Sequence, residues 1–434
     1  MKKTLLSAAL LAACVADMSA QKMTFVPYTE NNSIWASCVS SNGKYLGGTC
    51  GDLRGFIYNV ETGEIKYYTP TGDAAADGSE NDANVYSVTN DGIGVGYIDY
   101  KGATFSFATG ETAYALPEET DNSLLKFATA DGSFMAGVTY NSEYTQMPFY
   151  MVEGVKHDLP TPSEDWLGYE VNGFSLSGGN ADGSIILGYS NDNFDTHPLI
   201  IWVKNADGKS YSVEALSRQY VDESLDWSGP QKYEMFEGAA ISENGEWLAV
   251  NMHVKDDEES GIGIGRFNLK NYSLDVITCP AEGPDVYNYA NSIANDGTIV
   301  GYSENQISYG RTAIICKGGE TEAQLLSDAY PQLAELKTMD SNEFNSPNMI
   351  TADGRYIAGF GYVDVDDQNL AFASYLIDTQ AETDAVEGVE AEAKQNKVVA
   401  AYGIDGKKTP VANGAVKRLT VNRYANGMVK KVIK

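Results

Sequence analysis

Aromatic side chains gather in two polar stretches and are the residues of this sequence best suited to bind a ligand. SRQYVDESLDWSGPQKYEMFEG (217–238) carries Tyr220, Trp227 and Tyr233, and SEDWLGYE (163–170) carries Trp166 and Tyr169. Because aromatic faces stack on sugar rings and on protein partners, these five residues are candidate ligand-binding residues. The alternative is that they anchor long loops to the body of the protein.

No catalytic motif accompanies these aromatic residues. The three histidines, His157, His197 and His253, lie far apart, and no GxSxG, HExxH or phosphate-binding glycine loop is present. With 60 Asp and Glu residues, pairs of nearby acids are unavoidable, so spacing cannot identify a glycosidase pair. We predict no catalytic residue, cofactor site or metal site, and we keep an enzymatic alternative open.

One acidic stretch offers oxygen ligands for a structural calcium ion. It runs from Asp364 through Asp366 and Asp367 to Asn369. The stretch lacks the glycine and the terminal glutamate of a recognised calcium loop, which favours an exposed acidic loop instead.

The charge of the chain excludes one class of partner. The formal net charge is −30, and no Lys/Arg-rich patch precedes the C-terminal segment. Such a field repels polyanions, so we expect no nucleic-acid partner. The acidity fits the solubility needs of an extracellular protein.

The N-terminus predicts export. Lys2 and Lys3 precede an apolar run, and small residues follow up to Ala20, so residues 1–20 have the layout of a signal peptide. The sequence LAAC (11–14) resembles a lipobox, which would place a lipid on Cys14. Cleavage near Ala16 or after Ala20 would instead release a soluble chain. No other apolar run approaches membrane-spanning length, so we expect no transmembrane span.

Four cysteines follow this signal: Cys38, Cys50, Cys279 and Cys316. An exported chain can oxidise them, and four cysteines allow three pairings, which the sequence leaves open. Without a CxxC pair or a Cys/His cluster, a structural zinc site is not expected.

Seven copies of one phrase organise the chain between residues 33 and 378. Each copy ends in a turn glycine, and most have a second glycine four or five residues later. The copies are CVSSNG (38–43), SVTNDG (87–92), FATADG (127–132), GGNADG (178–183), AISENG (240–245), SIANDG (292–297) and MITADG (349–354). Asn/Asp-Gly pairs accept the left-handed backbone of a tight hairpin, so each copy predicts two short antiparallel strands.

A third apolar segment and often a fourth follow each hairpin, as in PLIIWV (198–203) and YSVEAL (211–216). Four short strands per roughly 50 residues are typical of a β-propeller blade. We therefore predict an all-β fold, a β-propeller of seven four-stranded blades over residues 21–378. Six or eight blades and an open solenoid are the alternatives.

The ends of the repeat region predict how the ring closes. The seventh repeat has no obvious fourth strand, because it runs into an acidic linker (379–395). The N-terminal segment KMTFVPYT (22–29) is a strand without a partner. If it supplies the missing strand, the ring closes and no edge stays exposed.

The closest copy, SIANDGTIVGYS (292–303), resembles the HAF-type repeats of extracellular bacterial proteins, which are predicted propellers. That resemblance covers residues 33–378 and implies an extracellular propeller without shared catalytic residues. The basic tail 396–434 predicts a small β-domain and resembles the C-terminal sorting domain of the type IX secretion system. The matching features are the Asp405-Gly406-Lys407 turn, the Asn426-Gly427 turn and the final Lys-Val-Ile-Lys strand. The usual Leu-x-x-Gly-x-Tyr motif is absent, and the segment from Leu419 to Tyr424 is only a loose match to it.

These features predict a secreted or cell-surface, non-enzymatic binding module, a monomer that recognises a glycan, a peptide or another envelope partner through its loops. One alternative is an extracellular polysaccharide-degrading hydrolase or lyase on the same scaffold, and another is a structural component of an outer-membrane assembly. Acids and cations gathered at one mouth of the central channel would favour the enzyme.

Overall fold

The computed structural model describes most of the chain between residues 21 and 433. The described residues are 21–27, 33–71, 81–117, 122–142, 145–161, 173–190, 199–215, 233–254, 262–281, 283, 285–364, 370–380, 398–402, 408–409, 419–424 and 429–433. The chain divides into two compact units, residues 21–379 and a second unit that contains residues 380–434. The signal-like residues 1–20, Cys14 and most of the acidic linker lie outside the described residues.

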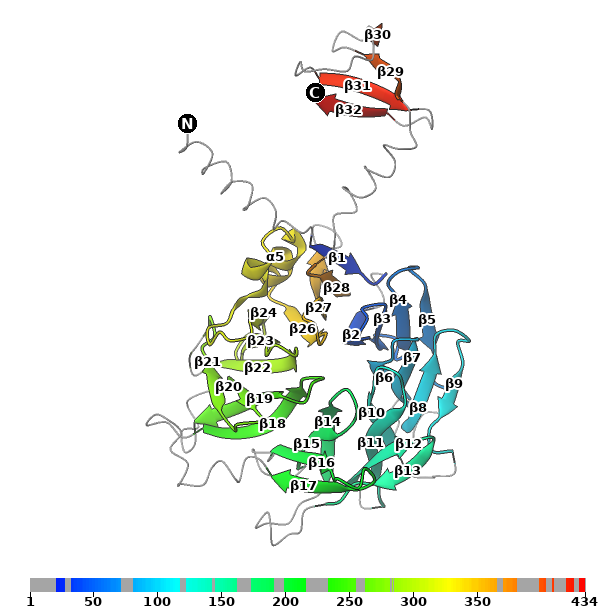
Figure 1. The fold of residues 1–434 in the computed structure, drawn as a ribbon, viewed down its shortest axis with the longest axis vertical. Coiled ribbons are helices and arrows are strands. Elements are labelled where there is room, and N and C mark those ends of the chain that lie inside the picture. Colours follow the sequence, from blue (N-terminus) through cyan, green and yellow to red (C-terminus); the bar gives the residue numbers. More distant parts are fainter. Residues whose placement is uncertain are drawn as a thin grey trace. The chain divides into compact units, whose positions relative to one another are not determined.

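Residues 21–379 form seven four-stranded antiparallel sheets arranged as a ring, which confirms the predicted seven-bladed propeller (Figure 1). Blade 1 contains β2 (Ile34–Val39), β3 (Tyr45–Cys50), β4 (Gly55–Asn59) and β5 (Ile65–Tyr68). Blade 2 contains β6 (Ala83–Val88), β7 (Ile93–Ile98), β8 (Lys101–Ser106) and β9 (Thr112–Tyr114). Blade 3 contains β10 (Ser123–Ala128), β11 (Phe134–Tyr140), β12 (Gln146–Val152) and β13 (Val155–Asp158). Blade 4 contains β14 (Phe174–Gly179), β15 (Ile185–Ser190), β16 (Leu199–Lys204) and β17 (Tyr211–Ala215). Blade 5 contains β18 (Tyr233–Ile241), β19 (Trp247–Val254), β20 (Gly263–Asn268) and β21 (Leu274–Ile277). Blade 6 contains β22 (Val286–Ile293), β23 (Ile299–Asn305), β24 (Arg311–Cys316) and β25 (Gln324–Leu325).

The seventh blade joins the two ends of the ring. Its inner strands are β26 (Asn345–Ile350), β27 (Tyr356–Asp364) and β28 (Leu370–Asp378), and the N-terminal strand β1 (Lys22–Phe25) pairs with β28 as its outer strand. This pairing confirms the predicted closure. The buried Ser374 hydroxyl also ties blade 7 to blade 1, since Oγ donates to Ile34 O at 2.6 Å and accepts from Ala36 N at 2.7 Å.

The repeated phrase is the hairpin between the first and second strand of each blade. Its glycine takes positive φ in every copy, for example 72° at Gly43 and 86° at Gly297. The residue three positions earlier closes the turn in most copies: Ser40 Oγ, for instance, accepts from the backbone N of Tyr45 at 3.0 Å. We call the side of the ring with these turns the turn face, and the opposite side the loop face.

A β-bulge at the same position of every innermost strand explains the second glycine of the repeat. In blade 2 the register shifts between Val85 and Ser87, so Tyr86 is the extra residue. The bulge moves the carbonyl of Asn84 toward Gly96, where an added Cβ would lie 1.8 Å from that oxygen. In blade 6 the Cβ of a residue replacing Gly301 would lie 2.0 Å from Tyr289 O.

Blade 5 is the copy without this glycine, and its first strand compensates. Val250 stands where the other blades have glycine, and it pairs with Gly238 on β18. Two register shifts flank Gly238, instead of the single shift of the other blades. In blade 5 the glycine of this pair therefore lies on the first strand, β18, and not on the second strand, β19.

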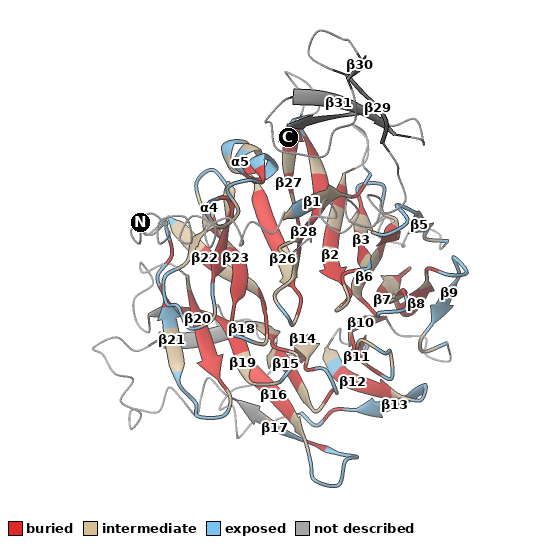
Figure 2. Ribbon diagram, turned by 45° about the horizontal axis from the view of Figure 1, so that its top comes forward, coloured by how far each residue is buried: buried red, intermediate tan, exposed pale blue. Residues whose placement is uncertain are grey.

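Apolar side chains fill the space between neighbouring blades, so the core is a ring of separate clusters, and buried residues lie along the central strands (Figure 2). Between blades 3 and 4, fully buried Trp202 packs with Phe134 and donates its Nε1–H to Pro160 O at 2.7 Å. Between blades 5 and 6, buried Arg266 binds Asp275 at 2.9 Å and also donates to the backbone oxygens of Gly297, Lys317 and Glu320.

The four cysteines are buried free thiols. Cys38 packs in the cluster between blades 1 and 2, whereas Cys50 packs in the cluster between blades 7 and 1. The two side chains therefore lie on opposite faces of blade 1, which excludes a bond between them. Cys279 and Cys316 share the cluster between blades 5 and 6.

Two short helices interrupt the β-structure between blades 6 and 7, and the sequence analysis did not predict them. They are α4 (Leu326–Ala329) and α5 (Ala334–Ser341). Leu336 and Met339 of α5 are fully buried in the cluster that Ile357 and Tyr375 of blade 7 also join. The insertion thus covers one side of blade 7.

The second unit contains a four-stranded antiparallel sheet in the order β30-β29-β31-β32. Its strands are β29 (Val398–Tyr402), β30 (Lys408–Thr409), β31 (Leu419–Tyr424) and β32 (Val429–Ile433). The fold of the tail is thus the small β-module that the alternating residue pattern predicted.

The bulge predicts which glycines resist substitution. We expect Gly96→Ala to lower the free energy of unfolding by at least about 2 kcal/mol, because the new Cβ meets a backbone oxygen that cannot move without loss of the bulge. Gly178→Ala is the matched control on an innermost strand, since its Cβ would meet nothing within 4 Å. Urea unfolding of both variants checks this, and equal stability would contradict the role of the bulge.

Candidate functional site

The innermost strands of all seven blades surround a central channel with a cavity of about 200 Å³. Six bulge residues line it: Ser37, Tyr86, Lys126, Ser177, Asn291 and Asn348. The two asparagines tie neighbouring blades together, as Asn291 Nδ2 donates to Pro347 O at 2.7 Å and Asn348 Nδ2 to Ala36 O at 2.8 Å. The bulge therefore supplies the polar wall of the channel.

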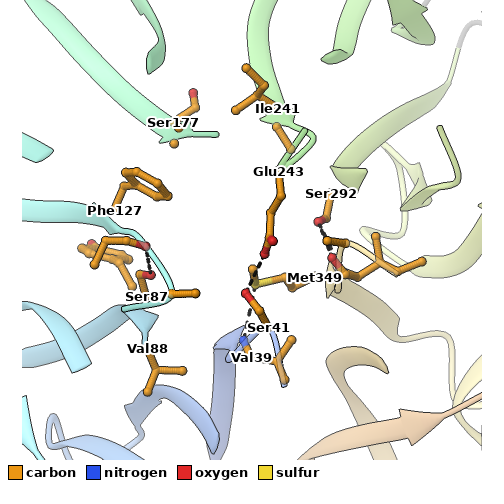
Figure 3. Close-up of a pocket in the computed structure, with 18 of the residues that line it drawn as sticks. Val39, Ser41, Ser87, Val88, Phe127, Ser177, Ile241, Glu243, Ser292 and Met349 are labelled. Atoms are coloured by element: carbon orange, nitrogen blue, oxygen red, sulfur yellow. Dashed lines mark hydrogen bonds between the residues drawn. The ribbon is translucent and has the colours of Figure 1, made fainter. Parts of the chain in front are cut away.

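A side-chain bridge crosses the channel at the turn face. Ser41 of blade 1 donates its Oγ–H to Glu243 Oε1 of blade 5 at 2.6 Å, and the two side chains point toward each other across the cavity (Figure 3). Backbone bonds between successive turns surround it, such as Asn295 N to Ala352 O at 2.9 Å. This bridge narrows the channel at the turn face.

At the loop face, a larger cavity of about 660 Å³ opens between blades 1, 2 and 3. Its wall is mainly tyrosine, with one carboxylate, one amide and two leucines: Tyr86, Tyr97, Tyr100, Tyr140, Asp82, Asn122, Leu53 and Leu124. We call this cavity the tyrosine pocket. Tyr86 lines both the tyrosine pocket and the channel, so this residue borders both cavities.

The repeat positions these side chains. Tyr97 follows the glycine that faces the bulge, and it pairs in register with Asn84 at the loop-face end of blade 2. Asp82 immediately precedes β6, and Tyr140 ends β11. The pocket is therefore built where the first strand begins and the second strand ends.

Burial raises the pKa of Tyr86, Tyr97 and Tyr140 in this pocket. Tyr97 OH donates to Asp82 Oδ2 at 2.5 Å, and the Tyr86 and Tyr97 rings lie 5.8 Å apart. Burial raises the pKa of Tyr86 to about 12 and, together with the Asp82 carboxylate, raises the pKa of Tyr97 above its ordinary value. The wall of the pocket thus combines tyrosine hydroxyls with the Asp82 carboxyl group.

Lys126 is the cation beside this pocket. Its Nζ lies 4.0 Å from the centre of the Tyr86 ring, a cation–π contact. Burial lowers the pKa of its ammonium. Among the described residues, no hydrogen bond or ion pair joins Lys126 to a carboxylate.

A second aromatic group occupies the loop-face ends of blades 6 and 7. Tyr302 and Phe360 take the register position that Tyr97 has in blade 2. Arg311 lies over the rings of Tyr302 and Phe344, at 4.4 and 5.2 Å, and its Nε donates to Glu304 at 2.6 Å. Here the cation is already neutralised, unlike Lys126.

The residues singled out from the sequence fall largely outside the described part of the chain. This holds for Trp166, Tyr169, Tyr220 and Trp227. Tyr233 begins β18 and pairs with Val254, but its side chain is not described. Their proposed role in ligand binding stays a prediction.

The other candidates from the sequence are placed only in part. His157 stacks on Tyr150 at 5.0 Å on the outer strand β13, away from the channel, while His197 and the side chain of His253 are not described. Asp364 ends β27 and accepts from Asn342 at 3.2 Å, and Asp366, Asp367 and Asn369 lie outside the described residues. Among the described side chains, no group of three His, Cys, Asp or Glu is placed to hold a metal ion.

The sequence analysis missed the tyrosine pocket, although a signal for it was present. The repeat places an aromatic residue directly after its second glycine in Gly96-Tyr97, Gly188-Tyr189 and Gly301-Tyr302. The sequence analysis did not single out that residue. Its fixed place at the loop face makes it a functional candidate as well.

The raised tyrosine pKa predicts alkaline sensitivity. A hydroxyl that ionises at about 12 when folded and near 10 when unfolded stabilises the fold below pH 10, and this contribution is lost as the pH rises toward 12. We expect the free energy of unfolding to fall over that window, and to fall less steeply in Tyr86→Phe. Urea unfolding at several pH values measures the slopes, and identical slopes would contradict the assignment.

None of the helices in the described part of the chain has the length and apolar character needed to cross a membrane.

No protein-family model matches the sequence, and no curated protein matches it. Several solved structures are similar in fold. An oligogalacturonate lyase from Vibrio parahaemolyticus shares 13% identity at a TM-score of 0.50, covering 83% of this chain and 94% of its own. An oligogalacturonate lyase in complex with manganese shares 11% identity over 85% of this chain and 99% of its own, with a TM-score of 0.49. TolB from Acinetobacter baumannii shares 12% identity over 68% of this chain and 65% of its own, with a TM-score of 0.35. At such identities, what the first of these structures shares with this chain is the propeller fold alone.

Proposed function

We propose that this chain is an exported, non-enzymatic β-propeller that binds a carbohydrate at the tyrosine pocket. The observation that carries the proposal is the pocket itself, in which four half-buried tyrosines surround a carboxylate and an amide. Sugar rings have apolar faces that stack on aromatic rings and hydroxyl edges that bond to carboxylates and amides. The pocket offers both kinds of group within one cavity.

The geometry of the pocket supports binding by a preformed site. The bulge and its facing glycine hold Tyr86 and Tyr97 on adjacent strands, and the bond from Tyr97 to Asp82 fixes the carboxylate before any ligand arrives. Preorganised side chains lose little conformational entropy on binding, which improves affinity. We also propose that the aromatic residues of 163–170 and 217–238 contribute to ligand binding.

Affinity measurements on the full chain test this proposal. We expect selective binding on a glycan array, and an affinity about tenfold weaker for Tyr140→Ala because one stacking face is lost. Tyr97→Phe keeps the ring but removes the donor to Asp82, so a smaller loss is expected. Tyr114→Ala, at an exposed tyrosine on the outer strand β9 of blade 2 that does not line the pocket, is the control that keeps full affinity. Equal affinity in all variants would contradict the site.

The enzymatic alternative is tested with the same ligands. A polysaccharide-degrading hydrolase would release shortened chains, and a lyase would release chains with an unsaturated end that absorbs ultraviolet light. If the wild-type chain forms such products and Asp82→Asn does not, the chain is an enzyme, and the proposal of a non-enzymatic binding module is wrong. Bound sugar recovered unchanged supports the binding module.

We further propose that the chain is an HAF-type repeat protein of the bacterial cell surface or the extracellular medium. The signal-like residues 1–20, the strongly acidic composition and the basic β-module of residues 396–434, similar to a type IX sorting domain, support this location. A role as a structural part of an outer-membrane assembly would share that location and would require a fixed protein partner.

Deletion of residues 396–434 tests the sorting role in a bacterium that has the type IX route. We expect the full chain to reach the surface with its N-terminus near Gln21, and the truncated chain to stay inside the outer membrane after signal cleavage. Mass spectrometry of the recovered chains also shows whether Cys14 carries a lipid. A truncated chain at the surface would contradict the sorting role of the tail.

A further inference from the structure

Lys126 is the lysine of the described channel wall, and it has no acidic partner within the described residues. Four other lysines pair with Asp or Glu at the surface, namely Lys44, Lys66, Lys156 and Lys270. The fully buried Arg266 has a carboxylate and three backbone oxygens as acceptors. Among the described residues, the ammonium of Lys126 lies over the face of Tyr86 and reaches no carboxylate, although the chain carries 60 Asp and Glu residues.

Such a position is costly for an ammonium group. Lys126 is half-buried in the channel wall, and burial of a charge without a counter-charge is unfavourable. The lowered pKa of its ammonium reflects that cost. A partner from outside the chain that brings a negative charge would offset it.

The surrounding charges define where an anionic group can sit. Asp82 places a negative charge in the tyrosine pocket, and Tyr97 already satisfies one of its oxygens. Glu243, the carboxylate of the described channel wall, is engaged by Ser41 at the turn face. An anionic group is therefore repelled from the pocket floor and attracted to Lys126, on the channel side of Tyr86.

We propose that Lys126 is an anion subsite that receives the carboxylate of a uronic acid, while a neighbouring sugar ring of the same chain lies in the tyrosine pocket. Tyr86 connects the two positions, because it lines both cavities and the Lys126 ammonium lies over the face of its ring. This inference rests on the proposed carbohydrate function and specifies its ligand as an acidic oligosaccharide.

Calorimetry on the full chain with matched tetrasaccharides tests the subsite. The ligands are an oligouronate, its methyl ester, which keeps the shape but removes the charge, and a sulfated neutral chain of the same length. We expect the oligouronate to bind at least tenfold more tightly than its ester, in line with a charge-assisted hydrogen bond. We also expect the affinity for the oligouronate to fall as salt is added.

Substitution of the lysine locates the effect. Lys126→Met keeps the apolar stem and is expected to remove the preference for the free acid while the ester still binds. Lys126→Arg is expected to restore much of the preference. Lys204→Met is the matched control, because Lys204 also lies over a tyrosine ring, 6.0 Å from that of Tyr211 on the outer strands, and keeps wild-type selectivity. Circular dichroism confirms that each variant is folded.

The outcomes separate the two proposals. Equal binding of acid and ester to the wild-type chain, or a preference that survives in folded Lys126→Met, overturns the subsite and leaves the carbohydrate function intact. Tighter binding of the sulfated chain than of the oligouronate overturns the assignment to a carboxylate. Failure of all three ligands, together with a blank glycan array, overturns the carbohydrate function as well.

Discussion

The β-bulge of the innermost strands is the constraint on which the rest of this propeller depends. An extra residue in the first strand displaces one backbone carbonyl toward the second strand, so that a glycine must face it. The same extra residue lies at the channel wall, as Tyr86, Lys126 and Asn291 show. One local irregularity, repeated in each blade, therefore decides both the composition of the repeat and the chemistry of the channel.

Blade 5 shows that the constraint concerns space and not a particular residue position. Val250 occupies the position of the glycine, and the bulge region instead places Gly238 opposite it, between two register shifts. A close approach of two strands requires one small residue, and either strand can supply it. Glu243, in the turn of this same blade, reaches across the channel to Ser41, so the irregular blade also narrows the turn-face end of the channel.

The cations in the ring of blades differ in whether they have a carboxylate partner. Arg266 and Arg311 are cations with carboxylate partners, and both tie neighbouring elements together. Lys126 lies in the same ring of strands, but its ammonium lies over the Tyr86 ring and has no carboxylate partner among the described residues. In a chain with a net charge of −30, a cation without an acidic partner beside an aromatic pocket is the part of the surface best suited to an acidic ligand.

The sequence by itself determined the architecture. Asn/Asp-Gly turns require a left-handed glycine, and the alternating apolar strands between them require buried faces, so seven such units predict a closed ring with β1 as its last strand. Local rules of this kind act over a few residues and can be recognised along the chain. The helices α4 and α5 were missed, because they form a single insertion outside the repeat and are stabilised by packing on blade 7.

Only the tertiary structure decided which residues meet in the tyrosine pocket. Asp82, Tyr97, Lys126 and Tyr140 belong to two different blades, and nothing in their spacing indicates that they meet around Tyr86. The aromatic loops that the sequence analysis favoured were chosen by local composition, which reports residue type but not position on the ring. The relative placement of blades comes from ring closure and from packing between sheets, and these interactions join residues that are far apart in the chain.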